Sequence, residues 1–183
     1  MTEVEIKQLI TRAKAGDNEA FGLIYNEYLT PIYRYIYFRI GDKALADDLT
    51  QDVFIKVFSS LDRIVISDKS LLTYFYTIAR NLLIDNYRKK KIPTIAEEDA
   101  ENKLIEEGNP EKQTILLEDI KILKDALQKI SENEADVLIL KFIDDYSNKE
   151  IGQIIGKSEE AVRQLQSRGL KSLRQFINKK DFF

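Results

Sequence analysis

Residues 147–176, SNKEIGQIIGKSEEAVRQLQSRGLKSLRQF, predict two helices joined by a tight turn. Ser147 and Glu150 have the Ser-x-x-Glu spacing of a capping box, which starts a helix by satisfying free backbone amides. Gly156 permits a tight turn, and Ser158 can cap the second helix. A short helix, a glycine-containing turn and a longer basic helix form a helix-turn-helix candidate, whose second helix would lie in the major groove of DNA.

The second helix of this pair is predicted to have one apolar and one polar face. Val162, Leu165 and Leu173 mark the apolar face. At 100° per residue, the outward side and its flanks carry Glu160, Arg163, Gln164, Ser167, Arg168, Lys171 and Arg174. Gln, Arg and Glu can pair with base edges, and Lys and Arg can neutralise phosphates. An ordinary solvated face of a helical bundle is the alternative interpretation.

Outward from this motif, the apolar periodicity predicts helix nearly everywhere and no strand. Thr30 and Pro31 predict a helix boundary, with Thr30 as the cap and Pro31 at the first position of a new helix. Helical apolar faces are predicted over residues 6–13, 21–28, 33–40, 45–61, 72–83 (running on to 91) and 116–130. Two further helices are predicted to begin at the capping boxes of Ser131 and Ser147, the second reaching about Ile155, and the last helix, which Ser158 can cap, carries its apolar face from Val162 to Phe176. The predicted fold class is therefore all-α.

Charge is segregated along the chain, although the net charge is only −3. Residues 94–119 hold nine acids and two lysines, and residues 157–180 hold seven bases and two acids. Residues 94–112 also contain few large apolar groups and a Gly-Asn-Pro breaker, which predicts an acidic linker that is flexible in the free protein. We expect two small helical domains, residues 1–93 and 113–183, on either side of it.

The composition excludes several classes of function. Without histidine or cysteine, the chain lacks the usual zinc ligands, thiol redox chemistry and every Ser/His or Cys/His nucleophile pair. Carboxylate pairs such as Asp47-Asp48 point apart on a helix. No segment has the pattern of a secretory leader, and no apolar run approaches the ~18 residues that cross a bilayer. We expect a cytoplasmic protein that is not an enzyme, uses no cofactor and does not insert into membranes.

Four blocks of sequence, in order, resemble one family. They are GDNEAF (16–21), ADDLTQDVF (46–54), YTIARNLLIDNYRK (76–89), and YSNKEI (146–151) followed by AVR (161–163) and LKSL (170–173). Over nearly its whole length the chain resembles the sigma-70 family of RNA polymerase sigma factors, in the extracytoplasmic-function (ECF) group. The resemblance implies a protein that binds core RNA polymerase, recognises promoter DNA and promotes transcription initiation.

The resemblance also assigns residues to partners. The polymerase clamp coiled coil would meet Asp47, Asp48, Gln51 and Asp52, and the polymerase flap is a further expected contact. Single-stranded downstream promoter DNA would meet Tyr74, Tyr76, Arg80, Asn81, Asn86, Arg88 and Lys89. Double-stranded upstream DNA would meet Lys157, Ser158, Glu159, Glu160, Arg163, Gln164, Ser167, Arg168 and Lys171. For Tyr76 and Tyr87, a place in the core is an equally good interpretation.

Within the last helix we expect a division of labour, because N-terminal residues of a recognition helix approach bases and later basic residues meet the backbone. Arg163, Gln164 and Ser167 are assigned to bases, and Lys157, Arg168 and Lys171 to phosphates. Glu159 and Glu160 suit the positive end of the helix dipole but would also stand near DNA phosphates, so their role stays open.

Other readings of the chain remain. A helix-turn-helix regulator with an N-terminal interaction domain would share the C-terminal motif, and an enzyme working with carboxylates and lysine is a more distant alternative. The resemblance adds an anti-sigma protein as a candidate partner, and it implies that the acidic linker threads through the polymerase.

Overall fold

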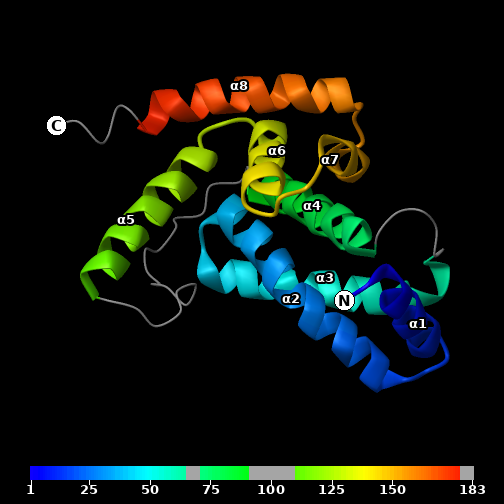
Figure 1. The fold of residues 1–183 in the computed structure, drawn as a ribbon. Helices are drawn as coiled ribbons and strands as arrows, with labels where there is room; N and C mark the ends of the chain where they lie inside the picture. Colours follow the sequence, from blue (N-terminus) through cyan, green and yellow to red (C-terminus); the bar gives the residue numbers. More distant parts are fainter. Residues whose placement is uncertain (65–70, 91–109, 178–183) are drawn as a thin grey trace.

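The computed structural model describes residues 1–64, 71–90 and 110–177, which form helices joined by short turns and loops (Figure 1). The helices are α1 (Glu3–Lys14), α2 (Asn18–Ile40), α3 (Lys43–Ser59), α4 (Leu71–Lys90), α5 (Pro110–Leu127), α6 (Glu132–Phe142), α7 (Asn148–Ile155) and α8 (Glu159–Ile177), with a 3₁₀ turn at Leu61–Arg63. No strand occurs in the described residues, which confirms the predicted all-α class. None of the helices there is long and apolar enough to cross a membrane.

The N-terminal half, α1–α4, packs around a row of aromatic and branched side chains. Ile24, Tyr28 and Ile32 of α2 are buried, and Phe75 of α4 is fully buried as well. The Phe75 ring centroid lies 5.2 Å from that of Tyr28 and 4.9 Å from that of Phe54 on α3. Rings at these distances and tilts add favourable quadrupole contacts to the burial of apolar surface.

The expected boundary at Thr30-Pro31 is wrong, because α2 continues without interruption from Asn18 to Ile40 with Pro31 inside it. Proline in a helix interior removes one backbone hydrogen bond and costs about 3 kcal/mol. Ile24, Tyr28, Ile32 and Tyr35 form one buried stripe on both sides of the proline. Burial of this stripe, at about 1.5–3 kcal/mol per large apolar side chain, outweighs the local cost.

Local capping signals in the C-terminal half are confirmed. Capping boxes are present at Ser131 with Glu134 and at Ser147 with Glu150. α7 ends at Gly156, whose φ of 69° is the left-handed conformation that glycine adopts at little cost. The Ser158 side chain accepts a hydrogen bond from the Ala161 backbone amide, 3.2 Å away, at the start of α8. The helix-turn-helix is therefore built as the sequence predicts.

The predicted linker, residues 94–112, mostly lies outside the described residues. Its last three positions are already helical, since α5 begins at Pro110. Proline suits the first helical position because its missing amide would be unsatisfied there anyway. The flexibility of the linker and the domain boundaries stay predictions.

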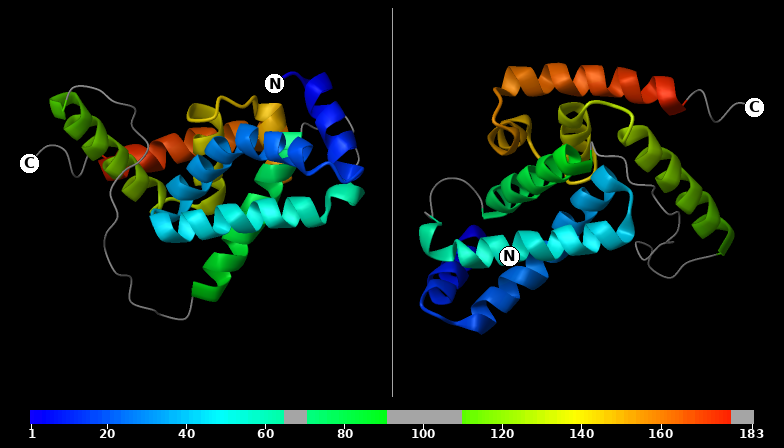
Figure 2. Two further views of the ribbon diagram at one scale, coloured as in Figure 1. Left: turned by 90° about the horizontal axis from the view of Figure 1, so that it is seen from below. Right: turned by 180° about the vertical axis from the view of Figure 1, so that it is seen from behind.

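The two halves pack against each other. α6 and α7 lie beside α2 and α4 in all three views (Figures 1 and 2), and α5 contacts the C-terminal end of α2. Lys124 of α5 donates a hydrogen bond to the Gly41 carbonyl at 3.1 Å, and its ammonium lies 5.1 Å from the Tyr37 ring centroid. One buried cluster of apolar side chains extends through both halves.

Candidate polymerase and nucleic-acid interfaces

The predicted polymerase-binding residues share the outer face of α3. Asp47, Asp48, Gln51 and Asp52 are all exposed. The opposite face, with Leu49, Val53 and Val57, is buried against the rest of the N-terminal half. Among the residues that the structure describes, none of these three aspartates forms an ion pair, so their charges face solvent. We call this surface the acidic face of α3.

Two apolar side chains that the sequence analysis did not single out extend this surface. Ile55 is 61% exposed and Phe58 is 49% exposed, although both belong to a helix with a well-packed core side. The Phe58 ring keeps one edge contact with Phe21, at 4.8 Å between centroids. The signal was available in the sequence: Ile55 lies midway between Val53 and Val57 of the buried stripe, which places it on the opposite side of the helix.

The residues predicted to contact downstream DNA all lie on α4, but their side chains differ in exposure and in the part of the molecule that they face. Asn81, Arg88 and Lys89 are exposed, and Asn86 is partly buried. The Tyr74 hydroxyl lies 2.9 Å from the Ser60 hydroxyl, which ties this ring to the end of α3. Tyr76 and Arg80 instead face the C-terminal half of the molecule.

Tyr76 is a core residue in this structure. It is fully buried, with its ring edge-on to Tyr35 at 5.2 Å and to Tyr146 at 5.3 Å between centroids. Its hydroxyl donates to Asp144 Oδ2 at 2.9 Å. Burial, with the nearby Asp144 carboxylate, raises the pKa of Tyr76 well above its ordinary range. Burial also raises the pKa of Asp144, against the opposing effect of its hydrogen bond from Arg34.

Arg80 is held by the C-terminal half through two hydrogen bonds. Its Nε donates to Asp136 Oδ2 and its Nη2 to Asn133 Oδ1, each at 2.9 Å. Its side chain is 18% exposed and that of Asp136 is 1% exposed. Arg80 is therefore engaged within the protein in this conformation.

The residues predicted to contact upstream DNA all lie on the solvent side of the second helix of the motif and the turn before it. Lys157, Ser158, Glu159, Glu160, Arg163, Gln164, Ser167, Arg168 and Lys171 are exposed. Val162, Leu165 and Gly169 on the other side are buried. A side chain at Gly169 would lie 3.2 Å from Leu138 of α6, so this glycine allows the close packing that presents the outer face.

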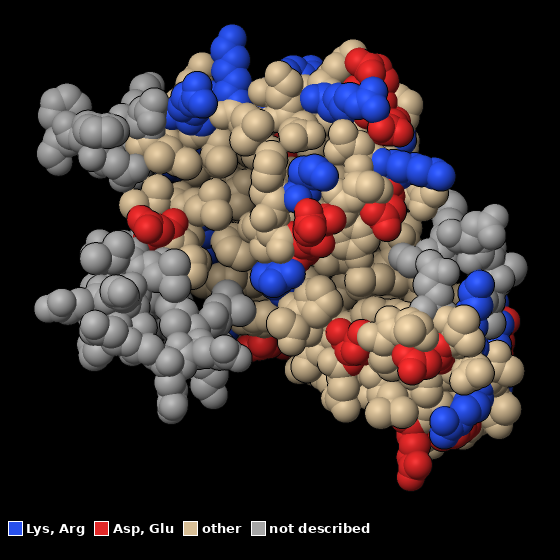
Figure 3. All heavy atoms as spheres, in the orientation of Figure 1, with Lys and Arg blue, Asp and Glu red and all other residues tan. Residues whose placement is uncertain are grey.

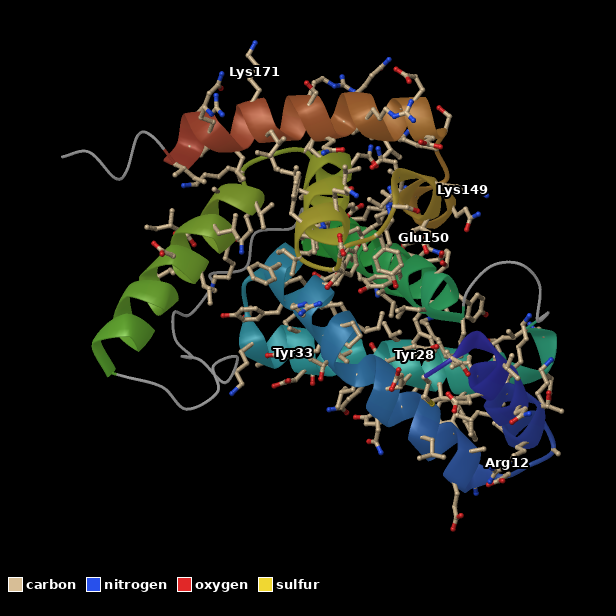
Figure 4. All side chains as sticks on the ribbon, in the orientation of Figure 1. Arg12, Tyr28, Tyr33, Lys149, Glu150 and Lys171 are labelled. Carbon is tan, nitrogen blue, oxygen red and sulfur yellow. The ribbon has the colours of Figure 1, made fainter. Side chains whose placement is uncertain are left out.

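The outer face of α8 carries both signs of charge. Lys171 projects away from the body of the molecule (Figure 4), and basic atoms run along the top of the space-filling view, with acidic atoms at one end (Figure 3). At that end the Arg163 guanidinium forms ion pairs with Glu159 and with Glu160, the latter at 3.2 Å. The two glutamates therefore orient the Arg163 side chain along its own helix.

Two family models match this chain. The family model for Sigma-70 region 2 matches residues 24–92, which include α3 and α4. The family model for Sigma-70, region 4 matches residues 126–175, which include α6, α7 and most of α8. A region 2 match in the N-terminal half is evidence against a helix-turn-helix regulator with an unrelated interaction domain.

The similar proteins include two curated relatives and one solved structure. The ECF RNA polymerase sigma factor SigW of Bacillus subtilis is 31% identical over 94% of this chain and 97% of its own length. BldN of Streptomyces coelicolor, also an ECF RNA polymerase sigma factor, is 30% identical over 93% of this chain. The matched part covers 65% of the length of BldN. CnrH, solved in complex with the cytosolic domain of CnrY, has the same fold, with a TM-score of 0.74 at 20% identity over 97% of this chain and 99% of CnrH. The chain therefore belongs to the ECF group of the sigma-70 family of RNA polymerase sigma factors.

Proposed function

We propose that three surfaces divide the work of this sigma factor. The acidic face of α3 binds core RNA polymerase, α4 binds the single-stranded downstream element of the promoter, and the outer face of α8 reads the double-stranded upstream element. Sigma factors are not enzymes, and on this proposal the protein positions the polymerase and catalyses no reaction itself.

The exposed outer face of α3 carries the proposal. Its aspartates are solvated, while Ile55 and Phe58 offer apolar surface one and two turns further along the same helix. Charge complementarity speeds encounter and sets orientation, and large apolar side chains supply most of the affinity in an interface. A basic, partly apolar coiled coil of the polymerase clamp is the partner that fits this combination.

α4 and α8 suit different forms of DNA. Exposed Asn81, Arg88 and Lys89 can bind the phosphates and bases of an unpaired strand. The base-contacting roles of Arg163, Gln164 and Ser167, and the phosphate-contacting roles of Lys157, Arg168 and Lys171, stand as part of the proposal, supported by the exposure of all six.

Location and further partners follow from the same role. A protein that works on core polymerase and promoter DNA acts in the cytoplasm. An anti-sigma protein is a candidate partner, supported by the solved complex of the sigma factor RpoE with the anti-sigma factor NepR from Bartonella quintana, to which this chain is similar in fold.

The test uses purified full-length protein, core polymerase and genomic DNA fragments. We expect defined transcript starts that depend on the protein, and complex formation weakened about tenfold or more by Asp48→Lys with Asp52→Lys. A matched control, Asp62→Lys with Asp119→Lys, makes the same charge change at exposed positions outside the three surfaces. Equal polymerase affinity for the two double variants, with helicity unchanged, would show that the acidic face of α3 is not the polymerase contact.

A further inference from the structure

The basic residues on the outer face of α8 and in the turn before it differ in their partners. Arg163 lies between two carboxylates: its Nη2 donates to Glu159 Oε1, and its Nη1 donates to Glu160 Oε2 at 3.2 Å. The Arg163 side chain is 57% exposed, and both glutamates are exposed as well. Within the part of the chain that the structure describes, no ion pair involves Lys157, Arg168 or Lys171. Arg163 is therefore a solvent-facing cation whose charge is already balanced within its own helix.

The spacing of the three residues explains this arrangement. Glu159 and Glu160 precede Arg163 by four and three residues, which places the three side chains next to one another on the helix surface. An acid on the N-terminal side of its basic partner is the more favourable order, and a negative charge is also favoured at the N-terminal end of a helix. The two ion pairs thus follow from the sequence of α8 alone and do not depend on the docking of other helices.

The pairs change what Arg163 offers to a phosphate. Non-specific affinity for DNA comes from cations that bind phosphates and release counterions from the duplex. A cation that two carboxylates already balance gains less from a phosphate, and the carboxylates repel that phosphate because like charges at short range oppose each other. Arg163 is therefore a weak phosphate ligand while Glu159 and Glu160 are in place.

A guanine is a different kind of ligand for the same side chain. Its O6 and N7 atoms in the major groove are neutral acceptors that pair with two N–H groups of an arginine. A guanidinium has five N–H donors, so Arg163 can keep a contact with one carboxylate and direct its other donors to the base. We propose that Glu159 and Glu160 are specificity-determining residues, which reserve Arg163 for a guanine of the upstream element by opposing its binding to phosphates. This inference rests on the proposed role of the outer face of α8 in reading upstream DNA.

The expected size of the effect follows from the exposure of the pairs. An exposed ion pair is worth about fivefold or less in an equilibrium constant, so two pairs should change DNA affinity about three- to tenfold. The salt dependence gives a second measure, because each neutralised phosphate contributes about 0.9 to the slope of log K against log salt. Release of Arg163 to a phosphate should steepen that slope by about one unit.

The first measurement follows non-specific binding. Full-length protein is titrated against a fluorescein-labelled duplex of mixed sequence, about three helical turns long, at several NaCl concentrations. We expect Glu159→Gln with Glu160→Gln to bind it about three- to tenfold more tightly, with a salt slope steeper by about one unit. The matched control, Glu19→Gln with Asp62→Asn, removes two exposed charges from the start of α2 and the 3₁₀ turn, elements that lie away from α8 (Figures 1 and 2). It should bind as the parent does, and equal behaviour of the two double variants overturns the proposal.

The second measurement shows whether the glutamates act through Arg163. The same two glutamine substitutions are made in a protein that carries Arg163→Ala. We expect most of the gain in affinity and in slope to be absent there, because no guanidinium remains to be released. An equal gain with and without Arg163 would mean that the glutamates only repel DNA, which overturns the proposal.

The third measurement follows base selection by the holoenzyme. Core polymerase with each protein selects from duplexes whose upstream positions are randomised, and the recovered sequences are counted. We expect the parent to enrich guanine at one upstream position, and the variant Glu159→Gln with Glu160→Gln to reduce that enrichment about three- to tenfold. A parent that selects no guanine, or a variant that selects it equally well, overturns the proposal.

Lys171→Ala tests the role of α8 separately. Lys171 projects away from the body of the molecule (Figure 4), so its loss should weaken binding to every sequence, whatever Arg163 contacts. Weaker binding by Lys171→Ala, together with no effect of the glutamine substitutions, would keep DNA binding by α8 and reject the specificity role of the glutamates. No effect of either change would reject the role of α8 and, with it, this inference.

Discussion

α4 and α8 are both expected to contact promoter DNA, yet their polar side chains have different surroundings in this structure. On α8 the predicted DNA contacts face solvent, and Arg163 is held only by glutamates of its own helix. On α4, Tyr76 and Arg80 are held by carboxylates from the other half of the chain. An amphipathic pattern predicts which side of a helix faces its own domain, but it cannot show that a second domain covers the other side.

The largest expected effect is on stability, and it distinguishes the buried ion pairs of Asp136 with Arg39 and Arg80 from the exposed ion pairs of Arg163. Asp136→Ala leaves Arg39 and Arg80 without their buried partner, and we expect the free energy of unfolding to fall by about 3–5 kcal/mol. Arg163→Ala on α8 removes two exposed ion pairs, each worth about 1 kcal/mol or less. Urea denaturation followed by circular dichroism measures both. Losses of equal size would mean that the buried ion pairs of Asp136 are no stronger than surface pairs.

The next effect tests the turn that presents α8. A Cβ at Gly152 would lie 2.5 Å from the Lys157 carbonyl oxygen, so Gly152→Ala forces the turn apart. We expect a loss of about 1–3 kcal/mol in thermal or urea unfolding. Gly22→Ala is the control: a Cβ there meets nothing within 4 Å, and the change should stabilise α2 by about 0.5–1 kcal/mol. A stable Gly152→Ala protein with normal upstream binding would show that the turn is adaptable.

Within α8, substitutions should separate base contacts from phosphate contacts. Gln164→Ala is expected to cost about 1–3 kcal/mol of promoter binding and to relax preference at one base position. Lys171→Ala should weaken all sequences alike and reduce the salt slope by roughly one unit. Holoenzyme binding to single-base promoter variants across salt concentrations distinguishes them, and the opposite pattern would reverse the assignment of the two residues.

The smallest expected effect is a loss of stability at alkaline pH, caused by ionisation of buried tyrosines in the N-terminal half. Burial raises the pKa of Tyr28 and Tyr76, and burial with the nearby Asp47 raises that of Tyr33 to about 12. Because these pKa values lie above the ordinary 10, the folded state favours neutral tyrosine. The stability that the raised pKa of Tyr33 contributes is complete below pH 10 and is lost as the pH rises through about 12.

Urea midpoints measured from about pH 8 to pH 11.5 should therefore be level at first and then fall. Absorbance at about 295 nm should show these tyrosines ionising later than free tyrosine. A midpoint that stays constant across the whole range would contradict the assigned burial.

Sequence reasoning succeeded where the deciding interactions are local. The capping boxes at Ser131 and Ser147 and the left-handed Gly156 each depend on residues within four positions of one another. The exposed set on α8 follows from the helical repeat and one buried stripe. Pro31 shows the limit of local rules, because burial of α2 against α3 and α4 overrides a break that the dipeptide favours.

The sequence alone therefore determined the helices, most of their ends, the family and the surfaces that α3 and α8 turn to solvent, because these depend on short-range hydrogen bonds and on the period of apolar side chains. Only the tertiary structure decided that region 4 docks on region 2. The Tyr35–Asp136 and Arg34–Asp144 contacts join residues 101 and 110 positions apart. No periodicity relates such positions, and a lone aspartate in an apolar helix gives no sign of its partner. The partner is defined only when folding brings both charges out of water together.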